Sequence, residues 1–340
     1  PEVMSRPAAL ARFIEEAQVC AQLQHPNIIP VHELGRLEDG RFYFTMQEIR
    51  GRSFDQVIAA VHDVRRVGGY ATDNGWTFRR LVDAFHQVCQ AVGHAHSRGV
   101  VHRDLKPANI MVGSQGQVQV VDWGLAKVRG LPDRAAAAGE LEAVQTARSE
   151  DDAQATRMGM VAGTPAYMPP EQAQGQVDRI DARSDVYALG AILYQVLTGR
   201  PPFEGPSGMD VLRQVQEGGP APITPSPLIP DELVAMVEQA MSRPMDDRFA
   251  HGHALSAEVN AWLEGAKKRE QALAVVDEAL KMDREREEMQ VEAVALPQAL
   301  HDADHLQREL ILSQVVAALE YDEDGLAEQC RSAFLIFCHT

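Results

Sequence analysis

Cysteine, long apolar runs and positive charge are all scarce in this chain of 340 residues. The four cysteines, which form no C-x-x-C pair, are Cys20, Cys89, Cys330 and Cys338. Their spacing argues against a disulfide framework or a zinc site and favours a reducing compartment. The longest apolar run, around Val186 to Leu197, is too short to span a bilayer. A formal net charge of −17 argues against nucleic acid as a general partner. Since no signal peptide is recognisable, we expect a cytoplasmic location and no membrane segment in this chain.

The most informative stretch is residues 102 to 109, which read H-R-D-L-K-P-A-N. Eighteen positions after Asp104 the triplet D-W-G begins at Asp122. The alternative to a functional reading is that these two aspartates are solvated loop carboxylates. Eight consecutive motif positions followed by a second triplet at this distance weigh against chance.

These residues supply what the transfer of a phosphoryl group to a hydroxyl requires. Asp122 and the neutral amide oxygen of Asn109 can hold Mg²⁺. Asp104 can then orient the attacking hydroxyl and accept its proton. Lys106 can reach the transferring phosphate as a point charge.

The sequence also predicts the local structure that carries Asn109 and Asp122. Two short apolar runs, residues 110–112 and 118–121, flank the turn signal of residues 113–116. The pattern predicts a hairpin, with Asn109 and Asp122 at its opposite ends.

Together these motifs resemble those of the protein kinase superfamily, and most closely the bacterial PknB-like, Hanks-type serine/threonine kinases. The resemblance runs from about residue 8 to about residue 263. It implies an α+β, two-lobed fold, with a truncated small β lobe over residues 1–49 and a mainly helical large lobe over residues 50–263. It also implies ATP and Mg²⁺ as cofactors. Lys106 and Thr164 fit the class that phosphorylates Ser and Thr hydroxyls of proteins.

The resemblance further assigns a nucleotide site. Glu16 stands where the family's regulatory helix carries the glutamate that pairs the nucleotide-binding lysine. Met46 matches the gatekeeper, and the backbone of Gln47 and Ile49 would face the adenine edge. Met111 matches the residue that packs under the adenine ring, a position at which it would also be ordinary core.

The resemblance implies a structural role in the large lobe for three further residues. The segment from Gly163 to Glu171 resembles the one that closes the activation region and docks substrate. Glu171 is expected to pair with Arg248, and Asp185 to hold the backbone of the catalytic loop.

Arg103 beside Asp104 indicates regulation. In kinases with this pair, the arginine awaits a phosphate on the activation segment, which adds roughly −1.5 to −2 charges and orders the loop. Here that segment carries an insertion from Gly130 to about Met160, rich in alanine and acidic residues. Thr156 is the acceptor that we favour over Thr146 and Ser149, because it lies closest to the docking segment. The alternative is that all three are ordinary solvated hydroxyls.

Two motifs of the family are missing from the chain, and their absence leaves two interpretations of its function open. No G-x-G-x-x-G is present and the first lysine is Lys106, so the family's glycine-rich loop and strand-3 lysine are missing. We therefore interpret the chain as a piece of a longer serine/threonine kinase, inactive on its own. The alternative is a catalytically inactive pseudokinase that acts as a scaffold. The coding sequence immediately upstream would discriminate between them.

The composition shifts after Trp262. Residues 264–340 are rich in charged residues, alanine and leucine, which predicts a helical extension of coiled-coil or tetratricopeptide-like type. Such a tail would offer a surface for protein partners. The alternative is an exposed helix that has no partner role.

Overall fold

The computed structural model describes residues 7–114, 116–128, 165–226, 228–266 and 268. The chain divides into two units, Pro1–Gly265 and Ala266–Thr340. Almost all of the expected extension over residues 264–340 lies outside the described residues, as do Thr156 and Thr164.

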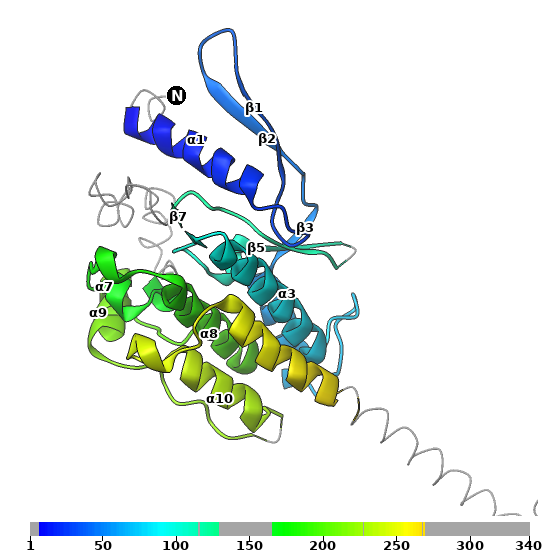
Figure 1. The fold of residues 1–340 in the computed structure, drawn as a ribbon. Helices are drawn as coiled ribbons and strands as arrows, with labels where there is room; N and C mark the ends of the chain where they lie inside the picture. Colours follow the sequence, from blue (N-terminus) through cyan, green and yellow to red (C-terminus); the bar gives the residue numbers. More distant parts are fainter. Residues whose placement is uncertain (1–6, 115, 129–164, 227, 267, 269–340) are drawn as a thin grey trace, which may run out of the picture. The chain divides into compact units, whose positions relative to one another are not determined.

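The described chain begins with one helix and a two-stranded antiparallel hairpin. The elements are α1 (Pro7–Gln22), β1 (Val31–Arg36) and β2 (Phe42–Met46). Gly40 takes the positive φ of 89° that the tight turn between the strands requires. In Figure 1 α1 lies alongside the hairpin, where the ring of Phe13 packs 4.7 Å from that of Phe44. This contact gives the small hairpin an apolar support that two strands alone lack.

A three-stranded antiparallel sheet follows, in the order β3-β5-β6. Its strands are β3 (Gly51–Ser53), β5 (Ile110–Gly113) and β6 (Val118–Val120). The β5–β6 hairpin is the one that the turn signal predicted. The segment before β1 joins the far edge of β6, because the Asn27 carbonyl accepts from Val120 N–H at 2.8 Å. The Asn27 side chain also donates to the Val118 carbonyl at 2.8 Å. The N-terminal elements are thus tied to the sheet that lies between the motif of residues 102–109 and the D-W-G triplet.

Two long helices form the centre of the helical part, α3 (Phe78–Ser97) and α8 (Ala182–Thr198). Leu81, Phe85, Val88, Val92 and Ala95 recur at helical spacing along α3, and all five are buried. Asp181 caps the start of α8, where its side chain accepts from Arg183 N–H at 2.8 Å. Gly199 ends it with a φ of 76°. Because α3 and the later helix α10 (Asp231–Ala240) pack against it, α8 is buried on nearly every side.

The remaining elements surround these helices. They are α2 (Phe54–Arg66), β4 (Val100–Val101), η2 (Pro107–Asn109), β7 (Lys127–Val128), η3 (Pro165–Tyr167), α7 (Pro170–Ala173), η4 (Val177–Arg179), α9 (Gly208–Glu217), α10 (Asp231–Ala240), η5 (Met245–Asp247) and a helix over residues 252–266. Within the described residues, none of the helices has both the length and the apolar character needed to cross a membrane.

The helix over residues 252–266 meets α3 backbone against backbone. A Cβ placed on Gly252 would lie 2.6 Å from the backbone nitrogen of Gly93, and one on Gly93 would lie 2.6 Å from that of His253. This approach lets Gly252 N–H donate to Nδ1 of His96 at 3.1 Å. The two glycines therefore bring the end of the helical part close enough to orient a histidine of α3.

We expect Gly252→Ala to lower the free energy of unfolding by about 1–3 kcal/mol, because the added Cβ meets backbone that cannot rotate aside. Urea unfolding followed by tryptophan fluorescence measures the change. The matched control is Gly219→Ala, where an added Cβ meets nothing within 4 Å. A Gly252→Ala variant as stable as this control would contradict the tight contact.

Candidate active site

Asp104, Lys106 and Asn109 lie within reach of one another in the loop between β4 and β5. The Lys106 Nζ atom is 3.2 Å from Oδ2 of Asp104. The Asn109 side-chain nitrogen donates to the Asp104 backbone carbonyl at 2.8 Å and to its Oδ2 at 3.1 Å. The short helix η2, which starts at Pro107, turns Asn109 back towards Asp104. With its side chain only 9% exposed, Asp104 is held in one direction.

Asp122 is brought to the same place by the β5–β6 hairpin. Asn109 precedes β5 and Asp122 closely follows β6, and the register that pairs Ile110 with Val120 brings both chain ends of the hairpin together. Val121 N–H donates to the Asn109 carbonyl at 3.0 Å. Asp122 itself has a φ of 65°, a left-handed conformation that few residues other than glycine adopt. Backbone strain of this kind is concentrated at functional sites.

The donor set of Asn109 and Asp122 fits Mg²⁺. Because the Asn109 side-chain nitrogen points at Asp104, its amide oxygen is turned to the other side. An amide oxygen and a carboxylate are hard ligands, and Mg²⁺ usually takes one or two such groups from a protein together with substrate phosphates. The two residues could therefore share a nucleotide-bound metal.

Asp185 holds the backbone that precedes Asp104. Its carboxylate accepts from His102 N–H at 2.7 Å and from Arg103 N–H at 2.9 Å. Arg103 needs this support, because its φ of 70° is unfavourable for a residue with a side chain. Burial alone would raise the pKa of Asp185, but its hydrogen bonds, the strongest from His96, outweigh burial and lower that pKa. Asp185 therefore stays ionised inside the core.

His96 completes the contacts of this carboxylate. Its Nε2 atom lies 2.9 Å from Oδ2 of Asp185. Since Nδ1 accepts from Gly252 N–H, the ring proton sits on Nε2 and is donated to Asp185. The sequence analysis does not single out His96, because nothing in the local pattern distinguishes it from His86 or His94.

His102 and Trp123 link the two motifs through their side chains. Both are almost fully buried, and their ring centroids lie 4.5 Å apart. The indole N–H donates to the Val120 carbonyl at 3.4 Å, which satisfies its polar edge. Trp123 therefore fills the buried space beside His102 with a large apolar ring.

Glu171 and Arg248 form a buried ion pair, as the resemblance implied. The guanidinium donates to both carboxylate oxygens, at 2.8 and 3.0 Å, and Ser184 Oγ donates to Glu171 at 2.7 Å. Arg248 also donates to three backbone carbonyls, those of Arg183, Ser242 and Arg243. Burial would raise the pKa of Glu171, but Arg248 outweighs it and lowers that pKa. This pair fixes α7 against α8 and the segment around η5.

Four of the five predicted nucleotide residues lie at the end of β2, in the connection to β3, or on β5. Met46 ends β2 and is 45% exposed, while Gln47 and Ile49 lie in the connection to β3. Met111 lies in β5, where it pairs with Ser53 of β3. Glu16 lies in α1, and its side chain is outside the described structure. Their roles towards a nucleotide stay predictions.

Comparison with known proteins indicates the family of this chain. The profile of the protein kinase domain family matches residues 3–286. The chain is 35% identical over 269 residues to the serine/threonine-protein kinase PknD of Protochlamydia amoebophila, which covers 78% of the chain and 26% of that protein. It is 35% identical over 266 residues to the serine/threonine-protein kinase pkn3 of Myxococcus xanthus, covering 76% and 43%. It is 35% identical over 247 residues to the serine/threonine-protein kinase PknB of Mycolicibacterium smegmatis, covering 72% and 34%. The chain thus spans less than half the length of each of these relatives.

We expect Glu171→Gln to lower the free energy of unfolding by about 3 kcal/mol near neutral pH, because it leaves the buried Arg248 charge without its counter-ion. The folded-state pKa of Glu171 lies below its ordinary value of 4.5. Its stabilising contribution is therefore present above that pH and is lost as the pH falls through the folded-state pKa. Urea unfolding at neutral and acid pH should show the difference between the two proteins shrinking in acid. Glu217→Gln, on the exposed side of α9, is the control; a Glu171→Gln effect no larger than the control would contradict the account.

Proposed function

This chain belongs to the protein kinase domain family, and we propose that the protein transfers the γ-phosphoryl group of ATP to Ser and Thr hydroxyls of other proteins. The observation that carries the proposal is the gathering of Asp104, Lys106, Asn109 and Asp122 around the open end of one hairpin. The relatives named above, all called serine/threonine-protein kinases, support the same class.

Asp104 orients the acceptor hydroxyl and takes its proton. Two contacts, from Lys106 and Asn109, fix the direction of its carboxylate before any substrate arrives. Preorganisation of this kind lowers the barrier, because no further reorganisation is needed at the moment of reaction. Lys106, beside that carboxylate, places a positive charge where the transferring phosphoryl group must pass.

Asn109 and Asp122 would hold Mg²⁺, which when bound neutralises the charge that develops on the outer phosphates. For the nucleotide, we assign the adenine edge to the backbone of Gln47 and Ile49, with Met46 as gatekeeper and Met111 beneath the ring. Glu16 of α1 would pair a lysine that grips the phosphates.

Regulation and location are assigned from the sequence alone. Arg103 would receive a phosphate on the activation segment, with Thr156 as the favoured acceptor, and Thr164 would meet Asp104 beside the substrate hydroxyl. Residues 264–340 would bind protein partners, and the kinase would work in the cytoplasm. The kinase function is favoured over the alternative of an inactive scaffold, because Asp104, Lys106, Asn109 and Asp122 are all present.

We expect Asp104→Asn in the full-length protein to lower kcat by roughly a hundredfold or more, since the amide cannot accept the hydroxyl proton. The affinity for MgATP should change little, because Asp104 is not assigned to the metal. Transfer of labelled phosphate to a serine-containing protein measures kcat, and calorimetry measures nucleotide binding.

Asp178→Asn is the matched control, because Asp178 lies exposed in η4. It should leave both quantities unchanged. An Asp104→Asn variant that keeps half of the wild-type kcat would refute the role of Asp104 as the group that accepts the hydroxyl proton.

A further inference from the structure

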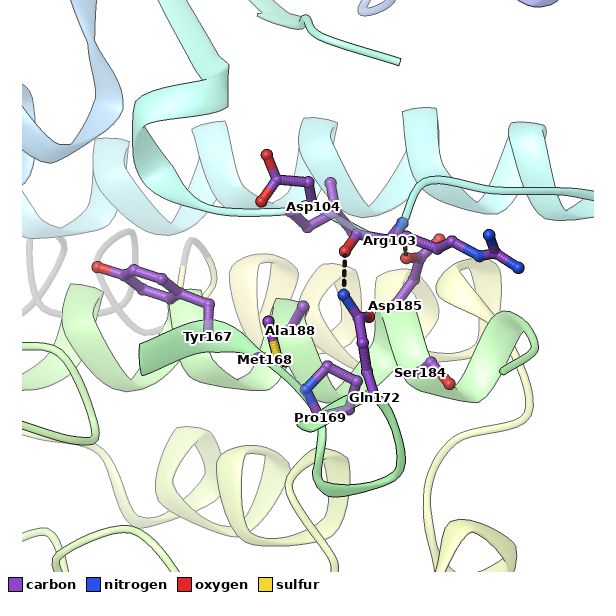
Figure 2. A pocket seen from close by; sticks show the side chains of 10 residues that line it. Arg103, Asp104, Tyr167, Met168, Pro169, Gln172, Ser184, Asp185 and Ala188 are labelled. Carbon is purple, nitrogen blue, oxygen red and sulfur yellow. Dashed lines mark hydrogen bonds between the residues drawn. The ribbon is translucent and has the colours of Figure 1, made fainter. Parts of the chain in front are cut away.

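The peptide unit between Arg103 and Asp104 is held at both of its polar atoms. Its carbonyl oxygen accepts from Nε2 of Gln172 at 3.0 Å, the contact drawn as a dashed line in Figure 2. Its N–H, which belongs to Asp104, donates to Nδ1 of His102 at 3.3 Å. Rotation of this unit would swing the Asp104 side chain, so the two hydrogen bonds bear directly on its direction.

The same unit follows a strained residue. Arg103 has a φ of 70°, and Asp185 holds the N–H on its other side at 2.9 Å. A left-handed residue of this kind persists only where its surroundings over-determine it. Asp185 fixes the peptide unit before Arg103, and Gln172 fixes the one after it. Without Gln172, the strain at Arg103 could relax by turning the unit that carries Asp104.

Gln172 reaches this carbonyl from a different part of the chain, which is itself firmly anchored. It lies in α7, next to Glu171, whose carboxylate is locked by Arg248. In Figure 2 its side chain extends from α7 to the loop, while the carboxylate of Asp104 points to the opposite side of that loop. Gln172 therefore acts on Asp104 through the backbone and does not touch its carboxylate.

Packing alone does not account for a glutamine here. The other amide atom, Oε1 of Gln172, is buried and has no hydrogen-bond partner among the described residues. A buried oxygen without a partner costs stability, and an apolar side chain of the same length would avoid that cost. The N–H donor to Arg103 is the contact that an apolar side chain could not replace.

We propose that Gln172 is a positioning residue for phosphoryl transfer. It couples the place of the docking segment, taken here from η3 to the end of α7 (residues 165–173), to the direction of Asp104. The proposal rests on the kinase function proposed above and deepens it. When the docking segment is seated, the donor of Gln172 meets the Arg103 carbonyl and Asp104 is aligned. When the segment is displaced, the donor is withdrawn and Asp104 is free to turn.

The test is Gln172→Met in the full-length protein, which keeps the length of the side chain but removes the donor without adding charge. We expect kcat to fall roughly ten- to a hundredfold, the usual effect of a small misplacement of a catalytic group. The dissociation constant for MgATP should stay within roughly twofold, because the nucleotide residues are not touched. The melting temperature should not fall. Gln174→Met, an exposed glutamine just after α7, is the matched control and should behave as wild type.

Each outcome is decisive. A wild-type protein that transfers no phosphate refutes the proposed function itself. An active wild type together with an equally active Gln172→Met leaves that function intact and overturns the role of Gln172. A parallel loss of MgATP affinity, or unfolding of both Gln172→Met and Gln172→Ala, would show a purely structural residue and also overturns the proposal.

Discussion

The candidate active site depends on one buried carboxylate. Asp185 accepts three hydrogen bonds, from the His96 ring and from the backbone N–H groups of His102 and Arg103. A charge buried in a protein is tolerated only when such donors replace its water. Because Asp185 stands on α8, which the core surrounds, the loop that carries Asp104 is attached to a buried helix.

A second set of contacts connects α7 to the same helix. Glu171, paired with Arg248, also accepts from Ser184, the residue next to Asp185 on α8. Neighbouring positions of one helix thus anchor the catalytic loop and α7. The hydrogen bond from Gln172 to Arg103 then joins these two anchored segments directly. Burying polar groups in this way contributes less to stability than to a unique arrangement of the loops, because each group needs its particular partner.

Much of this could be predicted from the sequence, where the signal was local. The motif at residues 102–109, the D-W-G triplet and the hairpin between them depend on short spacings, and the α3 core face depends on helical period. The Glu171–Arg248 pair followed only from the family resemblance, since 77 residues separate the partners. His96 and Gln172 were missed, because their partners are defined by helix packing and by a backbone carbonyl that no side-chain pattern reveals.

Amide hydrogen exchange at His102 and Arg103 tests the central role of Asp185 most directly. If its carboxylate holds both N–H groups, these amides should exchange as slowly as those of α8 in the wild-type protein. In Asp185→Asn, whose amide cannot accept all three donors, both should exchange much faster while α8 stays protected. Rapid exchange of the two amides in the wild type, or unchanged protection in Asp185→Asn, would contradict the account.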